Sequence, residues 1–144
     1  MFSSEDIEPG ALLAVWGGCV ITTRERHMLT EYEDRYTLQI GDDHHLACTV
    51  EQAGVAEQVN HSCNPNAGLQ GPVSLVAMQR ISTGEQVCFD YAMSEADPQF
   101  APMTCVCGEA GCRGVVDGNG WTLPSLRHKY AGYFSPYIAR RIRG

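Results

Sequence analysis

Short apolar runs separated by turn residues dominate the first two-thirds of the chain. The run over residues 36–40 alternates apolar and polar positions and is followed by Gly41-Asp42-Asp43, which has the residue types of a hairpin turn. Another is apolar and β-branched on both sides of a Gly17-Gly18 break. The candidate strands cover residues 11–22, 36–40, 46–50, 74–81 and 86–91. Strands this short and this closely spaced predict a mainly β domain.

The pattern changes after residue 91. Residues 93–100 are polar and loop-like, and two short helices are predicted nearer the C-terminus. The first covers residues 124–131, with Pro at its first position and Gly132 just past its end. The second opens at Ser135-Pro136, where Ser is expected to cap the helix and Pro to occupy its first turn.

The length and composition favour a single intracellular domain. At 144 residues the chain can bury one core. No apolar run approaches the roughly 18–20 residues that a membrane helix needs, and residues 1–6 lack the features of a signal peptide. We therefore expect a cytoplasmic protein, or a nuclear one in a eukaryote, without membrane contact. An oligomeric state is not specified, although a homodimer is compatible with this small size.

The net charge of −7 bears on the choice of partner. Nucleic-acid affinity comes largely from neutralising phosphates with Lys and Arg, so direct nucleic-acid binding is not expected. An acidic surface suits a basic partner instead, such as a Lys- or Arg-rich peptide. Residues 42–45 (Asp-Asp-His-His) have the side chains of a metal site, but in a hairpin turn we expect them to be solvated.

Seven cysteines are many for an intracellular chain of this size. Clustered cysteines in a reducing compartment more often bind metal than form disulfides. Cys105, Cys107 and Cys112 supply three thiolates within eight residues, and a structural zinc needs four ligands. From spacing alone the fourth ligand remains open among Cys63, Cys88, Cys48, Cys19 and a histidine.

Three motifs in order carry a family resemblance. Residues 60–66 (Asn-His-Ser-Cys-Asn-Pro-Asn) resemble the first signature of SET-domain lysine methyltransferases, and residues 84–91, which end in Phe-Asp-Tyr, resemble the second. The cysteine run is similar to the family's post-SET motif. The resemblance extends from about residue 2 to residue 116, and the C-terminal tail is similar to the ends of short bacterial SET proteins.

The resemblance implies a fold and a zinc ligand set. It implies a β-clip SET fold with a pseudoknot of short strands over residues 1–100, a post-SET zinc segment over 101–117 and a helical tail over 118–144. It also implies that Cys63 completes the zinc site. The cysteines that remain, Cys19, Cys48 and Cys88, lie in candidate strands and are expected to be small buried apolar residues.

The same resemblance implies an activity and its residues. A SET domain binds S-adenosylmethionine and methylates the ε-amine of a lysine in a protein, and a basic chromosomal protein is one candidate substrate. Asn60 and His61 would contact the cofactor, and Tyr91 would be the catalytic tyrosine and a further cofactor contact. Phe89 and Trp16 would line the substrate channel. Trp121 would either cover the cofactor or pack the tail against the core.

Two departures from the family pattern support a rival function. The family's Gly-x-Gly turn precedes the position of Phe2, so a chain that starts at Met1 is expected to lack it. The family's tyrosine in the first strand pair aligns with Val15, beside Trp16. A catalytically inactive SET module that binds a peptide is therefore the alternative hypothesis.

Overall fold

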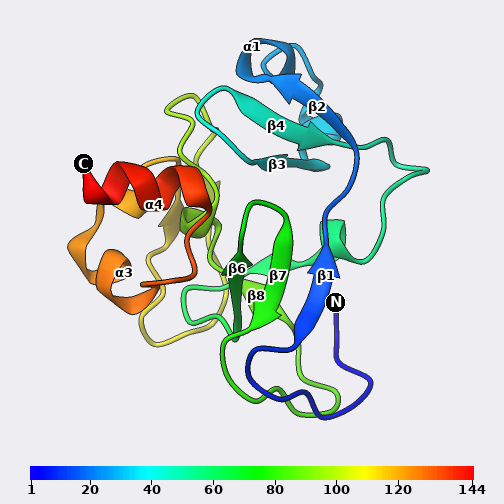
Figure 1. Ribbon diagram of the computed structural model, residues 1–144, viewed down its shortest axis with the longest axis vertical. Helices are drawn as coiled ribbons and strands as arrows, with labels where there is room; N and C mark the ends of the chain where they lie inside the picture. The colour runs from blue at the N-terminus through cyan, green and yellow to red at the C-terminus, as the bar shows by residue number, and fades with distance from the viewer.

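The computed structural model describes residues 1–144 as two small antiparallel sheets, with the two C-terminal helices beside them and a short helix above the upper sheet (Figure 1). The lower sheet has the order β1 (Leu12–Val15), β7 (Ser74–Ala77), β6 (Ala67–Gln70). The upper sheet has the order β2 (Cys19–Thr22), β4 (His44–Ala47), β3 (Thr37–Gln39). The chain passes from one sheet to the other at Gly17-Gly18, so the predicted break separates β1 from β2.

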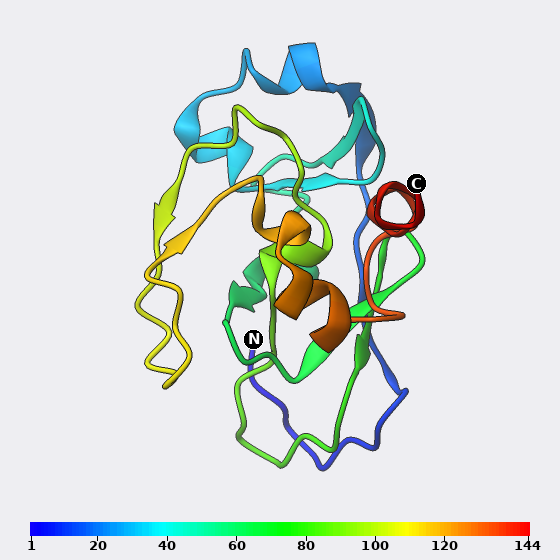
Figure 2. The same cartoon turned by 90° about the vertical axis from the view of Figure 1, so that its left-hand side faces the viewer.

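Two further strand pairs connect distant parts of the sequence. β5 (Asn60–His61) runs parallel to β8 (Cys88–Phe89), and the pairing sets Asn60 opposite Cys88 and His61 opposite Phe89. β9 (Met103–Thr104) and β10 (Val115–Val116) form a hairpin that encloses the cysteine run. Figure 2 shows this hairpin projecting on the opposite side of the molecule from the last helix.

Two four-residue helices, α1 (Thr23–Arg26) and α2 (Glu31–Asp34), were not predicted. Each begins with a capping box, in which the N-cap threonine and the glutamate three residues later bond each other's backbone N–H. The signal is visible as Thr22-x-x-Glu25 and Thr30-x-x-Glu33. The helices are too short to show apolar periodicity, which is why the hydrophobic pattern missed them.

The remaining helical segments lie before the first signature, at the end of the second, and in the C-terminal tail. They are η1 (Ala56–Gln58), η2 (Tyr91–Met93), η3 (Gly120–Thr122), α3 (Pro124–Lys129) and α4 (Pro136–Arg143). Both predicted C-terminal helices are confirmed, with Pro in the first turn of each. No helix has both the length and the apolar character that a membrane span requires.

A single core of 21 buried residues joins the sheets to the tail. It contains Leu69 and Leu75 from the lower sheet together with Tyr130 and Ile138 from the tail helices, and all four side chains are fully buried. The C-terminal tail and the sheets therefore share one hydrophobic core.

Several strands are shorter than the pattern predicted. The run over 74–81 forms β7 only as far as Ala77, and Ile81 instead makes a single bridge to Ile7. The run over 86–91 forms β8 at two residues and then turns into η2. The predicted loop over 93–100 is largely buried, and side-chain oxygens satisfy its backbone: the Ala96 N–H donates to Gln39 and the Asp97 N–H donates to Glu95.

Three side-chain predictions were wrong. The expected burial of Cys19, Cys48 and Cys88 fails, because Cys19 is exposed and the other two are partly exposed. Ser135 precedes α4 but its hydroxyl makes no cap bond and is buried without a partner. His45 was expected in a solvated turn, yet it lies in β4 and is fully buried.

Candidate functional site

The two signature segments meet at the β5–β8 pair. The Tyr91 backbone N–H donates to Nδ1 of His61 at 3.3 Å, and the two rings lie 5.3 Å apart, edge to face. Burial lowers the pKa of His61, which favours the neutral imidazole that accepts this bond. The backbone pairing thus fixes Tyr91 relative to the first signature, about thirty residues earlier in the chain.

The Tyr91 hydroxyl is held by a backbone carbonyl. It donates to the Val59 oxygen at 3.2 Å. Burial, with a smaller contribution from Cys88, raises the pKa of Tyr91 to about 12. The hydroxyl is therefore neutral near pH 7, and because its proton points at Val59, its lone pairs remain to accept from another group.

Three aromatic rings stand in series beside one cavity. The centroids of Tyr91 and Phe89 are 5.0 Å apart, and those of Phe89 and Trp16 are 5.5 Å apart. Trp16 is buried whereas its neighbour Val15 is 54% exposed, so Trp16 is the residue that faces Phe89. Trp16, in the connection between β1 and β2, therefore supplies an aromatic ring to the cavity wall. It lies one position after Val15, which aligns with the family's tyrosine.

The cavity has a volume of about 640 Å³, within the range of small-molecule and peptide side-chain sites. Residues from α1, α2 and the segment 100–103 line it together with the aromatic rings. Its lining residues are Trp16, Arg26, Glu31, Asp34, Arg35, Thr37, Leu38, Gln39, Ala56, Glu57, Val59, Asn60, Phe89, Tyr91, Ser94, Glu95, Phe100, Ala101, Pro102 and Met103. Four predicted site residues, Trp16, Asn60, Phe89 and Tyr91, thus share one cavity.

The four predicted zinc ligands come together. The Sγ atoms of Cys63, Cys105, Cys107 and Cys112 lie within 4.8 Å of one another. The sulfurs of Cys63 and Cys105 are 3.8 Å apart, close to the ~3.8 Å edge of a tetrahedron with zinc–sulfur bonds of about 2.3 Å. The donor set and its spacing fit a structural zinc ion.

Asp90 links the cysteine cluster, the first signature and the tail. Its fully buried carboxylate accepts two bonds from the Arg113 guanidinium, at 2.6 and 2.8 Å, and one from the Tyr130 hydroxyl at 2.9 Å. It also lies 3.6 Å from Nδ1 of His61. The Arg113 backbone N–H in turn reaches Sγ of Cys63 at 3.4 Å. A buried charge needs such partners.

Trp121 lies apart from the cavity lining. The guanidinium carbons of Arg127 and Arg141 lie 5.5 and 5.7 Å from the centre of its ring, and the ring packs against the core. This placement matches the packing alternative for Trp121. A contact with a bound cofactor stays a prediction.

Sequence reasoning missed several polar residues around the cavity. Asp90 lies in the second signature, which was interpreted only through its aromatic residues. Glu95 and Asp97 lie in a segment that was predicted to be a polar loop. Arg26 sits in a helix that was not predicted. The sequence offered one weak signal for Glu95 and Asp97. They are two acids at alternate positions in a segment that otherwise carries Ala, Ser and Met.

One protein-family model matches the part of the sequence that forms this site. The model described as SET domain covers residues 1–92, which include both signatures and the site residues from Trp16 to Tyr91. This chain belongs to the SET-domain family. The chain has the SET fold, mainly β with a few short helices. Of the four clustered cysteines, Cys63 lies inside the matched residues, and Cys105, Cys107 and Cys112 lie outside them.

The curated relatives of this SET domain are histone-lysine methyltransferases by name. A histone-lysine N-methyltransferase, H3 lysine-36 specific, of Candida albicans is 30% identical over 88% of this chain and 16% of its own length. The human histone-lysine N-methyltransferase 2D is 26% identical over 78% of this chain and 2% of its own length. The chain thus spans a sixth or less of these relatives' length.

A solved structure supports the fold. The crystal structure of KRYPTONITE in complex with mCHG DNA and SAH has a TM-score of 0.62 and 24% sequence identity, and the match covers 79% of this chain and 26% of that one. At this identity the likeness is evidence of shared fold.

Proposed function

We propose that this chain transfers a methyl group from S-adenosylmethionine to the ε-amine of a lysine in a protein substrate. The observation that carries the proposal is the neutral Tyr91 hydroxyl beside an aromatic-walled cavity, fixed by Val59 and His61, in a chain of the SET-domain family. The names of the curated relatives and the SAH in the KRYPTONITE structure support the same reaction.

The cofactor supplies an electrophilic methyl group on a positively charged sulfur. Asn60, which is exposed and lines the cavity, would bind it through its side chain. His61 would contact it mainly through its backbone, since its Nδ1 is already engaged with Tyr91. Holding the two reactants in line can supply a large part of the rate, and rigid β5–β8 pairing is suited to that task.

The lysine must arrive as a neutral amine. A free lysine has a pKa near ~10.4, and an apolar wall lowers that value because it disfavours the charged form. Trp16 and Phe89 provide such a wall. The free lone pairs of the Tyr91 oxygen would accept a hydrogen bond from the amine or a weak C–H contact from the methyl group. Because Phe89 has no hydroxyl to restrain the amine, we expect products beyond the monomethyl state.

The substrate is proposed to be a basic protein. The net charge of −7 and the histone substrates named for the relatives both favour a lysine-rich partner. Zinc at the four cysteines would hold the post-SET segment beside the cavity, whose lining ends at Met103, two residues before Cys105. The proposed division is a SET domain at 1–100, a zinc segment at 101–117 and a tail at 118–144.

The test is methyl transfer from labelled S-adenosylmethionine to core histones. We expect transfer by the wild-type chain and a loss of at least about 100-fold in Tyr91→Phe, because the variant loses the oxygen that is proposed to accept from the reacting amine or methyl group. Tyr133→Phe is the matched control, since Tyr133 packs against the core outside the cavity lining and should retain activity.

Calorimetry separates the rival function from the proposed one. A folded, zinc-loaded chain that fails to bind S-adenosylmethionine would contradict the enzymatic proposal. If that chain still bound a lysine-rich peptide, the inactive binding module would be the better description.

A further inference from the structure

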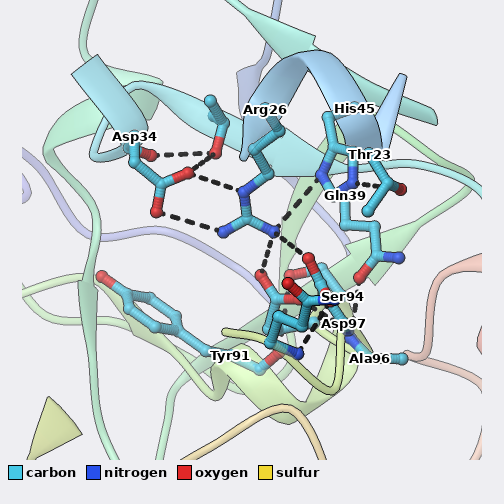
Figure 3. Close-up of polar contacts among 12 residues, drawn as sticks. Thr23, Arg26, Asp34, Gln39, His45, Tyr91, Ser94, Ala96 and Asp97 are labelled. Atoms are coloured by element: carbon cyan, nitrogen blue, oxygen red, sulfur yellow. Dashed lines mark hydrogen bonds and ion pairs between the residues drawn. The ribbon is translucent and has the colours of Figure 1, made fainter. Parts of the chain in front are cut away.

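Arg26 is a buried arginine with acidic partners on two separate segments (Figure 3). Its side chain is 5% exposed. Its Nε donates to Asp34 at 2.6 Å and one terminal nitrogen donates to the same carboxylate at 3.3 Å. The other terminal nitrogen donates to Glu95 at 3.0 Å. One guanidinium therefore binds two carboxylates that are 61 positions apart (95 − 34) in the sequence.

These two carboxylates come from separate segments that both line the cavity. Asp34 is the last residue of α2. It lines the cavity together with Glu31 at the start of that helix and Arg35 just after it. Glu95 follows η2, where its backbone N–H bonds the Tyr91 carbonyl at 2.8 Å. From there the chain continues through residues 100–103, which also line the cavity. Arg26 thus connects the α1–α2 segment (residues 23–34) to the 91–103 segment.

The surroundings make this connection specific. Phe100 covers the guanidinium with its ring centre 5.6 Å away, and Asp97 lies 3.8 Å from it. Asp97 is held in turn by His27 at 2.6 Å, and the fully buried His45 lies 3.4 Å from Arg26. The burial that raises the pKa of Glu95 opposes its ionisation, and Arg26 is the cation that offsets this effect.

A buried ion pair contributes little to stability compared with a well-packed apolar substitute. Its geometric consequence is larger, because the fork of an arginine fixes both the distance and the orientation of its partners. We propose that Arg26 is a positioning residue that holds the α1–α2 segment and the 91–103 segment together and so sets the width of the cavity. The consequence for substrate binding rests on the proposed function.

Hydrogen–deuterium exchange on the full zinc-loaded chain tests the connection without any activity. Arg26→Met should speed exchange of backbone amides by about tenfold or more in both segments, because each loses its anchor. Arg24→Met is the matched control: Arg24 is an exposed residue of the same helix, and its variant should exchange like wild type. Unchanged exchange in either segment of Arg26→Met would overturn the proposal.

A second variant tests the connection if Arg26→Met does not fold. Removing Arg26 leaves Glu95 buried without its cation and can unfold the chain. Asp34→Asn instead releases the α2 side alone, where the carboxylate is 36% exposed. It should speed exchange in residues 31–34 while the 91–103 segment stays protected by the Arg26–Glu95 pair. Protection of residues 31–34 equal to wild type would count against the connection.

Kinetics then test the consequence for substrate. With core histones, Arg26→Met should raise KM for the histone about tenfold and KM for S-adenosylmethionine by less, because Asn60, the proposed cofactor contact, lies on β5 outside the two segments that Arg26 joins. Arg26→Lys should restore part of the loss. A fall in kcat with an unchanged histone KM would contradict a positioning role. If the wild-type chain transfers no methyl group, the proposed function fails, and the exchange experiment alone decides on Arg26.

Discussion

At the scale of single residues, the buried His45 predicts a pH-dependent stability. Burial first, and then the positive charge of Arg26, lower the pKa of His45 to about 4, from ~6.5 in the unfolded chain. Between these values the unfolded state binds a proton that the folded state does not. The free energy of unfolding should therefore fall as the pH falls, by about 2 kcal/mol at most from pH 7 to pH 5.

Urea denaturation at pH 7 and pH 5 measures this effect. Protonation of zinc-binding thiolates would also weaken the fold at the lower pH, so the comparison needs a variant. His45→Gln removes the titrating group, and its loss of stability between the two pH values should be smaller than that of wild type. Equal losses in the two proteins would contradict the assignment to His45.

Gly118 predicts a second residue-scale effect. A methyl group placed on its Cα would lie 1.9 Å from the Asp97 carbonyl oxygen, a backbone atom that cannot move aside cheaply. Gly118→Ala should therefore lower the free energy of unfolding by about 2–4 kcal/mol. Gly17→Ala is the control, because nothing lies within 4 Å of the added methyl and its φ is not in the left-handed region. A Gly118→Ala protein as stable as Gly17→Ala would refute the close approach.

At the scale of elements, the β9–β10 hairpin depends on the proposed metal. Its two strands are each two residues long, and the intervening loop buries little apolar surface, with Val106 87% exposed. We expect about one zinc per chain. Cys112→Ser should abolish stoichiometric zinc, measured by elemental analysis, and make residues 103–116 sensitive to protease, whereas the exposed Cys19→Ser should change neither.

Motifs that carry their own chemistry were predictable from sequence, and contacts between distant segments were not. The gathering of Cys63 with the cysteine run followed from the family resemblance, and the hairpin at Gly41-Asp42-Asp43 followed from turn chemistry. The buried partners of Arg26 and Asp90 could not be found in this way. A polar residue in a short segment has the same local signature whether it is solvated or paired inside the molecule.

At the scale of the whole molecule, the tail packs against the two signature segments. Lys129 donates to the Cys63 carbonyl at 2.9 Å, and the Tyr130 hydroxyl oxygen lies 3.3 Å from the same carbonyl oxygen. Tyr130 also binds Asp90, and Ile138 enters the same core as the sheets. The proposed boundaries at residues 100 and 117 therefore separate segments by sequence motif, and the contacts across them predict a single cooperative folding unit.

The two tryptophans allow this cooperativity to be tested, because Trp16 belongs to the sheets and Trp121 to the tail. Trp121→Phe leaves fluorescence that reports on the sheets, and Trp16→Phe leaves fluorescence that reports on the tail. In each variant the fluorescence and circular-dichroism transitions in urea should coincide, since one core joins both parts. Comparing two probes within one variant removes any difference in stability between the variants. A tail that melts before the circular-dichroism transition would show that residues 118–144 are a separable unit.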